Sequence, residues 1–165
     1  MARNFSTQLA GQIGESLVVV ELGRRGIVAT AFSGNLPEIE LLAYIGGKTL
    51  HLQVKAWRKG AVSLDARRFL KISMEARKQV VDGLVDELEL GLLYVFVNIG
   101  ETAGMDRYFV LDQGVLAVLV RDGYESFLAK HNGVRPRNAE STHNAVTLAQ
   151  LQDYEDNWTL IEGHL

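Results

Sequence analysis

The stretch 38-EIELLAYIGGKTLHLQVKAW-57 decides the fold, because it is the clearest β-hairpin in the sequence. Two runs that alternate between apolar and polar residues flank Gly46 and Gly47. A pair of glycines suits the tight two-residue turns that join antiparallel strands. If these two glycines form the whole loop, Ile45 faces Lys48 and the pairing of every other residue follows.

The same register gathers polar side chains on one face of the predicted hairpin. Counting back from the turn places Glu40 opposite Gln53 and Glu38 opposite Lys55. All four side chains then share a face, because alternate residues of a strand point the same way. Two interpretations stay open at this point. The four groups can form a site, or Gln53 and Lys55 can belong to a solvated strand face, with Glu38 and Lys55 as a simple cross-strand ion pair.

The segment before the hairpin, 4-NFSTQLAGQIGESLVVVELGRRGI-27, predicts a helix that Gly23 or Gly26 can end. Apolar residues recur on two sides of this helix, so it is expected to pack on more than one face. Glu15 lies inside one of the apolar stripes. A carboxylate there is costly unless it lies at an edge, is paired, or binds a metal.

Beyond residue 57, apolar runs and turn residues alternate, which predicts a mixed α/β domain. Residues 27–32, 63–74, 92–99 and 106–112 are expected to be strands. Residues 75–89, 113–131 and 147–157 are expected to be helices, and 132–144 a polar loop. We therefore expect an α/β fold, with a central mixed sheet and flanking helices, in a single domain over residues 1–165.

Composition narrows the classes of function. The chain has 165 residues, of which 47% are hydrophobic and 22% charged, values typical of a globular domain. The formal net charge is -3, so binding to nucleic acid would need a local positive patch. The absence of cysteine excludes disulfides, thiolate metal sites and cysteine nucleophiles. No signal core or membrane-length apolar run is seen, so no membrane contact and a cytoplasmic location are expected.

The converging residues suggest metal chemistry. The carboxylates of Glu15 and Glu40 are hard oxygen ligands that suit Mg²⁺ or Mn²⁺. Either the amide oxygen of Gln53 or the backbone carbonyl of Val54 can complete such a site. Such a metal would activate water and offset charge on a phosphate. Lys55 could orient the water or neutralise developing negative charge.

These residues resemble the motif of the PD-(D/E)XK nuclease superfamily, in particular its Holliday-junction resolvase and methylation-dependent restriction endonuclease branches. The resemblance runs over Gly11–Trp57 and is carried by "GE", "EIELLA" and "LQVKAW". Glu15 matches the helix glutamate of the superfamily, and Glu40 matches its first-strand acid. Gln53 and Lys55 match the acid-x-lysine pair in its Gln-x-Lys form. The resemblance implies a restriction-endonuclease-like αβββαβ core.

The resemblance also implies a function. It implies a DNA endonuclease that needs Mg²⁺ or Mn²⁺ and hydrolyses phosphodiester bonds, with Glu15, Glu40, Gln53 and Lys55 as catalytic residues and the first three as metal ligands. Two departures stand beside it, since Glu40 replaces the usual aspartate and Gln53 supplies no charge. The alternative is therefore a weak or inactive nuclease-like module that binds nucleic acid or a protein partner. A homodimer is expected if both strands of a duplex are cut.

Two basic segments are candidates for contacts with DNA. Trp57, Arg58 and Lys59 could stack on a base and grip a phosphate. Arg135 and Arg137 stand in the polar loop, and their guanidinium forks match phosphate oxygens. For the first segment, the competing interpretation is a tryptophan at the edge of the sheet beside two exposed cations. For the second, it is an ordinary polar surface loop.

Overall fold

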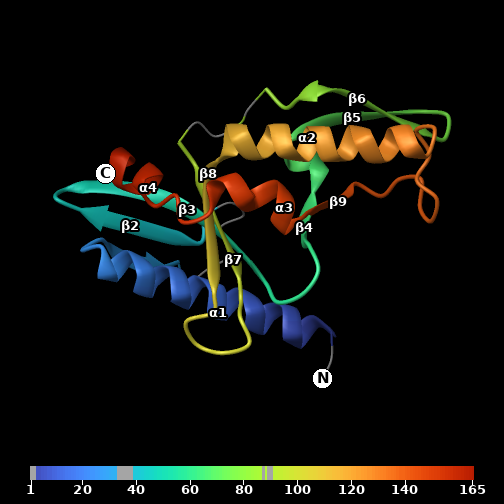
Figure 1. Cartoon of the computed structure of the whole chain (residues 1–165). Coiled ribbons are helices and arrows are strands. Elements are labelled where there is room, and N and C mark those ends of the chain that lie inside the picture. The colour runs from blue at the N-terminus through green and yellow to red at the C-terminus, as the bar shows by residue number, and fades with distance from the viewer. Residues whose placement is uncertain (1–2, 33–38, 87, 89–90) are drawn as a thin grey trace. The chain divides into compact units, whose positions relative to one another are not determined.

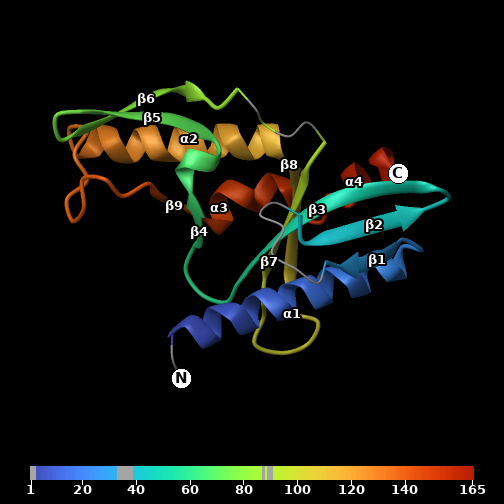
Figure 2. The same cartoon turned by 180° about the vertical axis from the view of Figure 1, so that it is seen from behind.

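The computed structural model divides the chain into two compact units, and the two are described separately (Figures 1 and 2). The structure describes residues 3–32, 39–86, 88 and 91–165, with side chains from residue 6 onward. The first unit comprises Met1–Gly60, Gly91–Asp112 and Leu151–Leu165. The second unit comprises Ala61–Leu90 and Gln113–Gln150.

The first unit is built on a five-stranded mixed sheet in the order β1-β2-β3-β7-β8. Its strands are β1 (Val28–Ala31), β2 (Leu41–Ile45), β3 (Lys48–Trp57), β7 (Leu93–Asn98) and β8 (Arg107–Asp112). Its helices are α1 (Arg3–Arg24), the 3-10 helix η2 (Gln152–Tyr154) and α4 (Thr159–His164). Strands β3 and β7 run parallel, whereas the other neighbours in the sheet are antiparallel.

Helix α1 lies along one face of this sheet, as both cartoon views show (Figures 1 and 2). The close approach depends on Gly14, since a Cβ at that position would lie 2.3 Å from the Cβ of Ala56. The helix ends where Gly26 adopts a φ of 77°, a conformation that favours glycine. The N–H of Ile27 then donates to the carbonyl of Leu22. The predicted helix and its glycine stop are confirmed.

Alternation along β3 separates two faces of the sheet. Leu50, Leu52 and Val54 join the apolar core beneath α1. Gln53 and Lys55 point the opposite way, since successive side chains alternate. The strand β3 therefore carries its polar residues on the face away from α1.

The hairpin has the predicted register. Ile45 pairs with Lys48 and Leu41 pairs with Leu52. Gly46 and Gly47 have φ values of 58° and 88°, which a type I′ turn requires at both central positions. Strands β7 and β8 form the expected second hairpin, with Phe96 opposite Phe109.

The second unit contains two small antiparallel sheets and a long helix. One sheet pairs β4 (Val62–Asp65) with β9 (His143–Val146), and the other pairs β5 (Leu70–Glu75) with β6 (Lys78–Leu84). The 3-10 helix η1 (Ala66–Arg68) joins β4 to β5, and α2 (Gln113–Lys130) is the long helix. Helix α3 (Leu148–Leu151) leads out of this unit into the first one.

The helix predicted over residues 75–89 is wrong, because the strand β6 runs through the middle of this segment. Ala76, with a φ of 57°, starts a tight turn, and β6 then pairs back along β5. The β-branched pair Val80 and Val81 suits this pairing, and helical propensity was overridden by it. The strand expected over 63–74 is likewise divided into β4, η1 and β5.

No helix in the described part of the chain combines the length and apolarity that a membrane span needs.

Candidate metal centre

Glu40 stands at the point where the ladder between β2 and β3 stops. Strand β2 begins at Leu41, and the N–H of Glu40 still donates to the carbonyl of Leu52 at 2.9 Å. Continuing the observed register by one residue places Glu40 opposite Gln53. Beyond this point β3 has no backbone partner from β2, and the carboxylate of Glu40 takes that place. Its Oε2 accepts the N–H of Val54 at 2.9 Å.

The second carboxylate oxygen of Glu40 faces a lysine. Nζ of Lys55 donates to Oε1 of Glu40 at 3.2 Å, and the two side chains keep 26% and 29% of their surface exposed. The hairpin register expected from the sequence places Glu38 opposite Lys55, but Glu38 lies outside the residues that the structure describes. An ionised carboxylate can accept about four hydrogen bonds or ligand contacts. Glu40 uses two of them, so both oxygens keep a lone pair for a cation.

Glu15 reaches the same region from helix α1. Gly14, the residue before it, packs against Ala56 of β3, which brings this turn of the helix close to the strand. The pKa of Glu15 is raised, first because the carboxyl group is partly buried and second because the negative charge of Glu40 lies nearby. Lys55 acts in the opposite direction. Two carboxylates and one ammonium group are thus electrostatically coupled at this place.

Gln53 lies in the middle of β3 with 1% of its surface exposed. Its Oε1 is buried and has no hydrogen-bond partner among the described residues. Burying a polar atom without a partner costs about 1–3 kcal/mol. A cation ligand would supply the missing partner for this oxygen.

The donor set fits a hard divalent cation. Glu15, Glu40 and Gln53 offer carboxylate and amide oxygens, which suit Mg²⁺ or Mn²⁺. No group of three or more His, Asp or Glu side chains that could hold a metal is found in the described residues. A cation here would therefore rely on two acids, with the third donor an amide or the carbonyl of Val54. Both Glu15 and Glu40 would also gain from the positive charge, since their like charges now oppose each other.

The residues of the candidate site come from both sides of the sheet. Glu40, Gln53 and Lys55 share the face of β3 that points away from α1, by pairing and by alternation. Glu15 comes from the helix that packs on the other face.

Trp57 is part of the core of the first unit. It is 7% exposed, and its ring lies 6.5 Å from that of Phe96 and 6.4 Å from that of Phe109. Its indole N–H donates to the carbonyl of Gly60 at 3.2 Å. The exposed cations of this segment are Arg58 and Lys59, which follow it directly.

Arg58 and Lys59 border an open pocket of about 400 Å³ in the first unit. The opposite wall is formed by Ser6, Thr7 and Ala10 near the start of α1. Arg135 and Arg137 belong to the second unit.

Comparisons with known proteins support the fold. No protein-family model matches the sequence, and no curated protein matches it. A solved structure, "The structure of a bacterial homing endonuclease: I-Ssp6803I", matches with a TM-score of 0.51 and 14% sequence identity. The match covers 94% of this chain and 93% of that chain.

The chain has a restriction-endonuclease-like α/β fold. This confirms the α/β fold class, with a mixed central sheet and helices, that the sequence predicted. At 14% identity the likeness shows the fold and not the activity. The Gln-x-Lys form of the motif and the roles of its residues therefore stay predictions.

Proposed function

We propose that this protein is a divalent-metal-dependent DNA endonuclease that hydrolyses phosphodiester bonds. The observation that carries this proposal is the electrostatic coupling of Glu15, Glu40 and Lys55, together with the buried amide oxygen of Gln53 on the same strand as Lys55, which has no partner in the described residues. Acidic residues whose pKa is shifted by burial and by a neighbouring carboxylate are typical of functional sites. The nuclease-like fold makes phosphodiester hydrolysis the reaction that best suits this group.

Each residue has a distinct part in the proposed site. Glu15 and Glu40 would hold Mg²⁺ or Mn²⁺, with the amide oxygen of Gln53 as the third donor. Such an ion supplies positive charge against the phosphate and lowers the pKa of water.

Lys55 is placed to act on the substrate phosphate. Its Nζ is fixed by Oε1 of Glu40 at 3.2 Å and remains partly exposed. An ammonium group at this position stabilises the negative charge that builds on the phosphate oxygens during attack. It can also orient the attacking water by donating a second hydrogen bond, since an ammonium group has three donors.

Cleavage of plasmid DNA tests the proposal directly. The wild-type protein should nick or linearise plasmid in Mg²⁺ or Mn²⁺ and should do neither in EDTA. Lys55→Ala should abolish cleavage. Lys48→Ala is the matched control, because Lys48 is an exposed lysine of the same strand near the hairpin turn. Cleavage that survives equally in both variants would contradict the proposal.

A second candidate function follows from the lack of charge on Gln53. With two acids instead of three, the site would bind a cation more weakly, and the protein could bind nucleic acid or a protein partner without cutting. Calorimetric titration with Mn²⁺ separates the two. The nuclease proposal expects saturable binding that Glu15→Ala removes. An absence of binding at millimolar Mn²⁺, together with tight DNA binding, would favour the non-cutting module.

A further inference from the structure

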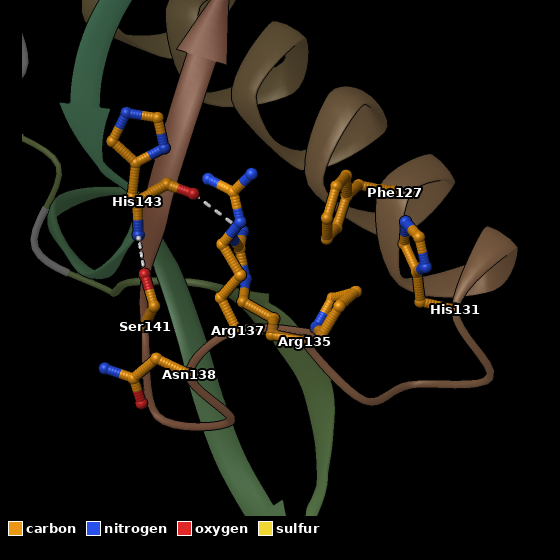
Figure 3. A pocket seen from close by; sticks show the side chains of 8 residues that line it. Phe127, His131, Arg135, Arg137, Asn138, Ser141 and His143 are labelled. Atoms are coloured by element: carbon orange, nitrogen blue, oxygen red, sulfur yellow. Dashed lines mark hydrogen bonds between the residues drawn. The ribbon is translucent and has the colours of Figure 1, made fainter.

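The second unit contains a pocket that has no counterpart in the proposed metal centre. It has a volume of about 510 Å³, within the range of roughly 300–1,000 Å³ that is usual for small-molecule sites. One wall is formed by Phe127 in the last turns of α2 and by His131 just after the helix, and the other by the loop before β9 and the first residue of that strand (Figure 3). The loop supplies Arg135, Pro136, Arg137, Asn138 and Ser141, and β9 supplies His143.

The loop is anchored to the rest of the second unit by Gln79 of β6. This side chain is 4% exposed, and its Nε2 donates to the carbonyls of Ala139 at 2.6 Å and Ser141 at 3.0 Å. The hydroxyl of Tyr124 donates to Oε1 of Gln79 from helix α2. The backbone N–H of Gln79 also donates to the carbonyl of Gly133 at 2.9 Å. The loop is therefore organised before any ligand binds, which lowers the entropy cost of binding.

Arg135 links the loop to α2 and leaves its charge unneutralised. Its guanidinium carbon lies 4.6 Å from the ring centroid of Tyr124 and 4.7 Å from that of Phe127. Its Nη2 donates to the carbonyl of His143 at 2.6 Å (Figure 3). None of the ion pairs seen between described residues includes Arg135 or Arg137. The pocket thus has a positive charge in its wall and no acidic residue in its lining.

Arg137 is the exposed cation of this pocket. Within the described part of the chain its side chain has no hydrogen bond or ion pair. A guanidinium group that is free to turn can bind a phosphate through two parallel N–H groups. Arg135 is already committed to the carbonyl of His143, so Arg137 is the better phosphate contact of the two.

The opposite wall of the pocket is aromatic. Phe127 keeps 37% of its surface exposed, so part of its ring is open to a ligand in the pocket. Its ring lies 4.5 Å from that of His131, at an interplanar angle of 45°. Stacking on exposed aromatic rings is a common way for proteins to hold an unpaired base.

We propose that this pocket binds one unpaired nucleotide of a DNA strand, with the base against Phe127 and His131 and the phosphate on Arg137. The inference rests on the proposed function, since it takes DNA as the substrate. A base inside a duplex has both faces covered by its neighbours, so only a flipped, frayed or single-stranded base can enter. The site therefore prefers single-stranded DNA or DNA with a mismatch to a fully paired duplex.

Fluorescence of a 12-nucleotide single strand with one central 2-aminopurine tests this inference. The measurement uses full-length Lys55→Ala protein in EDTA, so that no DNA is cut and no metal contributes. Binding should quench the 2-aminopurine, because stacking on an aromatic ring quenches this base. Phe127→Ala should remove the quenching and weaken the affinity about tenfold. Arg137→Ala should weaken the affinity to a similar degree, since each phosphate contact contributes to binding and to its salt dependence.

The chain offers matched controls for both substitutions. Val118→Ala changes an apolar residue of α2 that is 38% exposed and does not line the pocket. Arg121→Ala removes a partly exposed arginine of α2 that pairs with Asp122. Both controls should bind and quench as the parent protein does. Arg137 is exposed, so its variant should keep the parent's circular dichroism spectrum and remain informative if Phe127→Ala unfolds.

Four outcomes would overturn the inference. The first is equal affinity and equal quenching in Arg137→Ala and the parent protein. The second is binding of dAMP as tight as that of the oligonucleotide, which would assign the pocket to a free nucleotide. The third is displacement of the oligonucleotide by a polyglutamate peptide at equal affinity, which would assign it to acidic protein segments. Plasmid cleavage lost in Lys55→Ala but unchanged in Phe127→Ala and Arg137→Ala would leave the nuclease proposal intact and reject the pocket.

Discussion

Lys55 donates a hydrogen bond from Nζ to Oε1 of Glu40 at 3.2 Å, while Oε2 of the same carboxylate accepts the N–H of Val54. One side chain thus ends the β2–β3 ladder and positions the proposed catalytic lysine. The two tasks can be separated by substitution, because a neutral amide can accept a backbone N–H but cannot balance an ammonium charge.

Replacing Glu40 by glutamine should therefore keep most of the stability that alanine loses. Glu40→Ala leaves the N–H of Val54 without its acceptor, and a cost of about 1 kcal/mol is expected for this partly exposed group. Glu40→Gln retains an acceptor oxygen and should unfold within about 0.5 kcal/mol of the wild type. Urea unfolding of the metal-free proteins measures both. Equal losses in the two variants would show that the carboxylate does not cap the ladder.

Replacing Gln53 by leucine should have opposite effects on stability and on metal binding. Oε1 of Gln53 is buried and has no partner in the described residues, so its removal should leave the free energy of unfolding equal or raise it by up to about 1 kcal/mol. Binding of Mn²⁺ should weaken, because a proposed ligand is lost. If Gln53→Leu lowered the free energy of unfolding by about 2 kcal/mol, Oε1 of Gln53 could not be unpaired in the folded protein.

Gln79→Leu is the matched control for that substitution. Gln79 is also buried, but its amide group bonds to two loop carbonyls and to the hydroxyl of Tyr124. Removing it leaves several partners unsatisfied, and a loss of about 2–3 kcal/mol is expected. Binding of Mn²⁺ should be unaffected by this change.

Asp65 should make the stability of the protein depend on pH in acid. Hydrogen bonds from Arg67, followed by one from Thr142, lower the pKa of Asp65 from an ordinary 3.8 to about 2, against the opposing effect of partial burial. Between these two values the unfolded chain binds more protons than the folded one, so stability falls as the pH falls. The contribution is complete above pH 3.8 and is lost towards pH 2.

Asp65→Asn isolates this contribution. Unfolding of the wild type and the variant should be compared in urea from pH 5 down to pH 2. The difference between them should be largest at pH 5 and should shrink steadily below pH 4. A difference that stays constant over the whole range would mean that Asp65 is not stabilised in its charged form.

Arg135 and Arg137 should differ in their effect on stability, although they stand two residues apart in one loop. Arg135→Ala removes the hydrogen bond to His143 and the contacts with two aromatic rings, which should cost about 1–2 kcal/mol. Arg137→Ala removes an exposed side chain and should change the free energy of unfolding by less than about 0.5 kcal/mol. Chemical denaturation compares them. Equal values would indicate that Arg135 does not anchor the loop.

The hairpin could be predicted from the sequence because its information is local. Two glycines that favour positive φ set the turn, and strict alternation on both sides sets the register that brings Glu40 opposite Gln53. The helix carrying Glu15 could be predicted for the same reason, from its apolar stripes and the glycine at position 26.

Tertiary pairing explains what the sequence could not predict. The helix expected at 75–89 is wrong because the pairing of β6 with β5 outweighs local propensity. The hydrogen bond that the Val54 N–H donates to Glu40 depends on where β2 begins, and the burial of Trp57 depends on its contacts with Phe96. The sequence analysis did not single out Phe127, the proposed base contact, although it lies beside the buried stripe of α2 that includes Tyr124 and Leu128.

The central claim is that Glu40 holds a divalent cation in a DNA-cutting site, and single-turnover cleavage of plasmid DNA by Glu40→Gln tests it most directly. The rate should be measured over a range of Mn²⁺ concentrations with enzyme in excess over DNA. We expect the variant to fold and to bind DNA as the wild type does, and to cut at least about a hundredfold more slowly. Cleavage by Glu40→Gln at the wild-type rate, with the same dependence on Mn²⁺, would contradict the account.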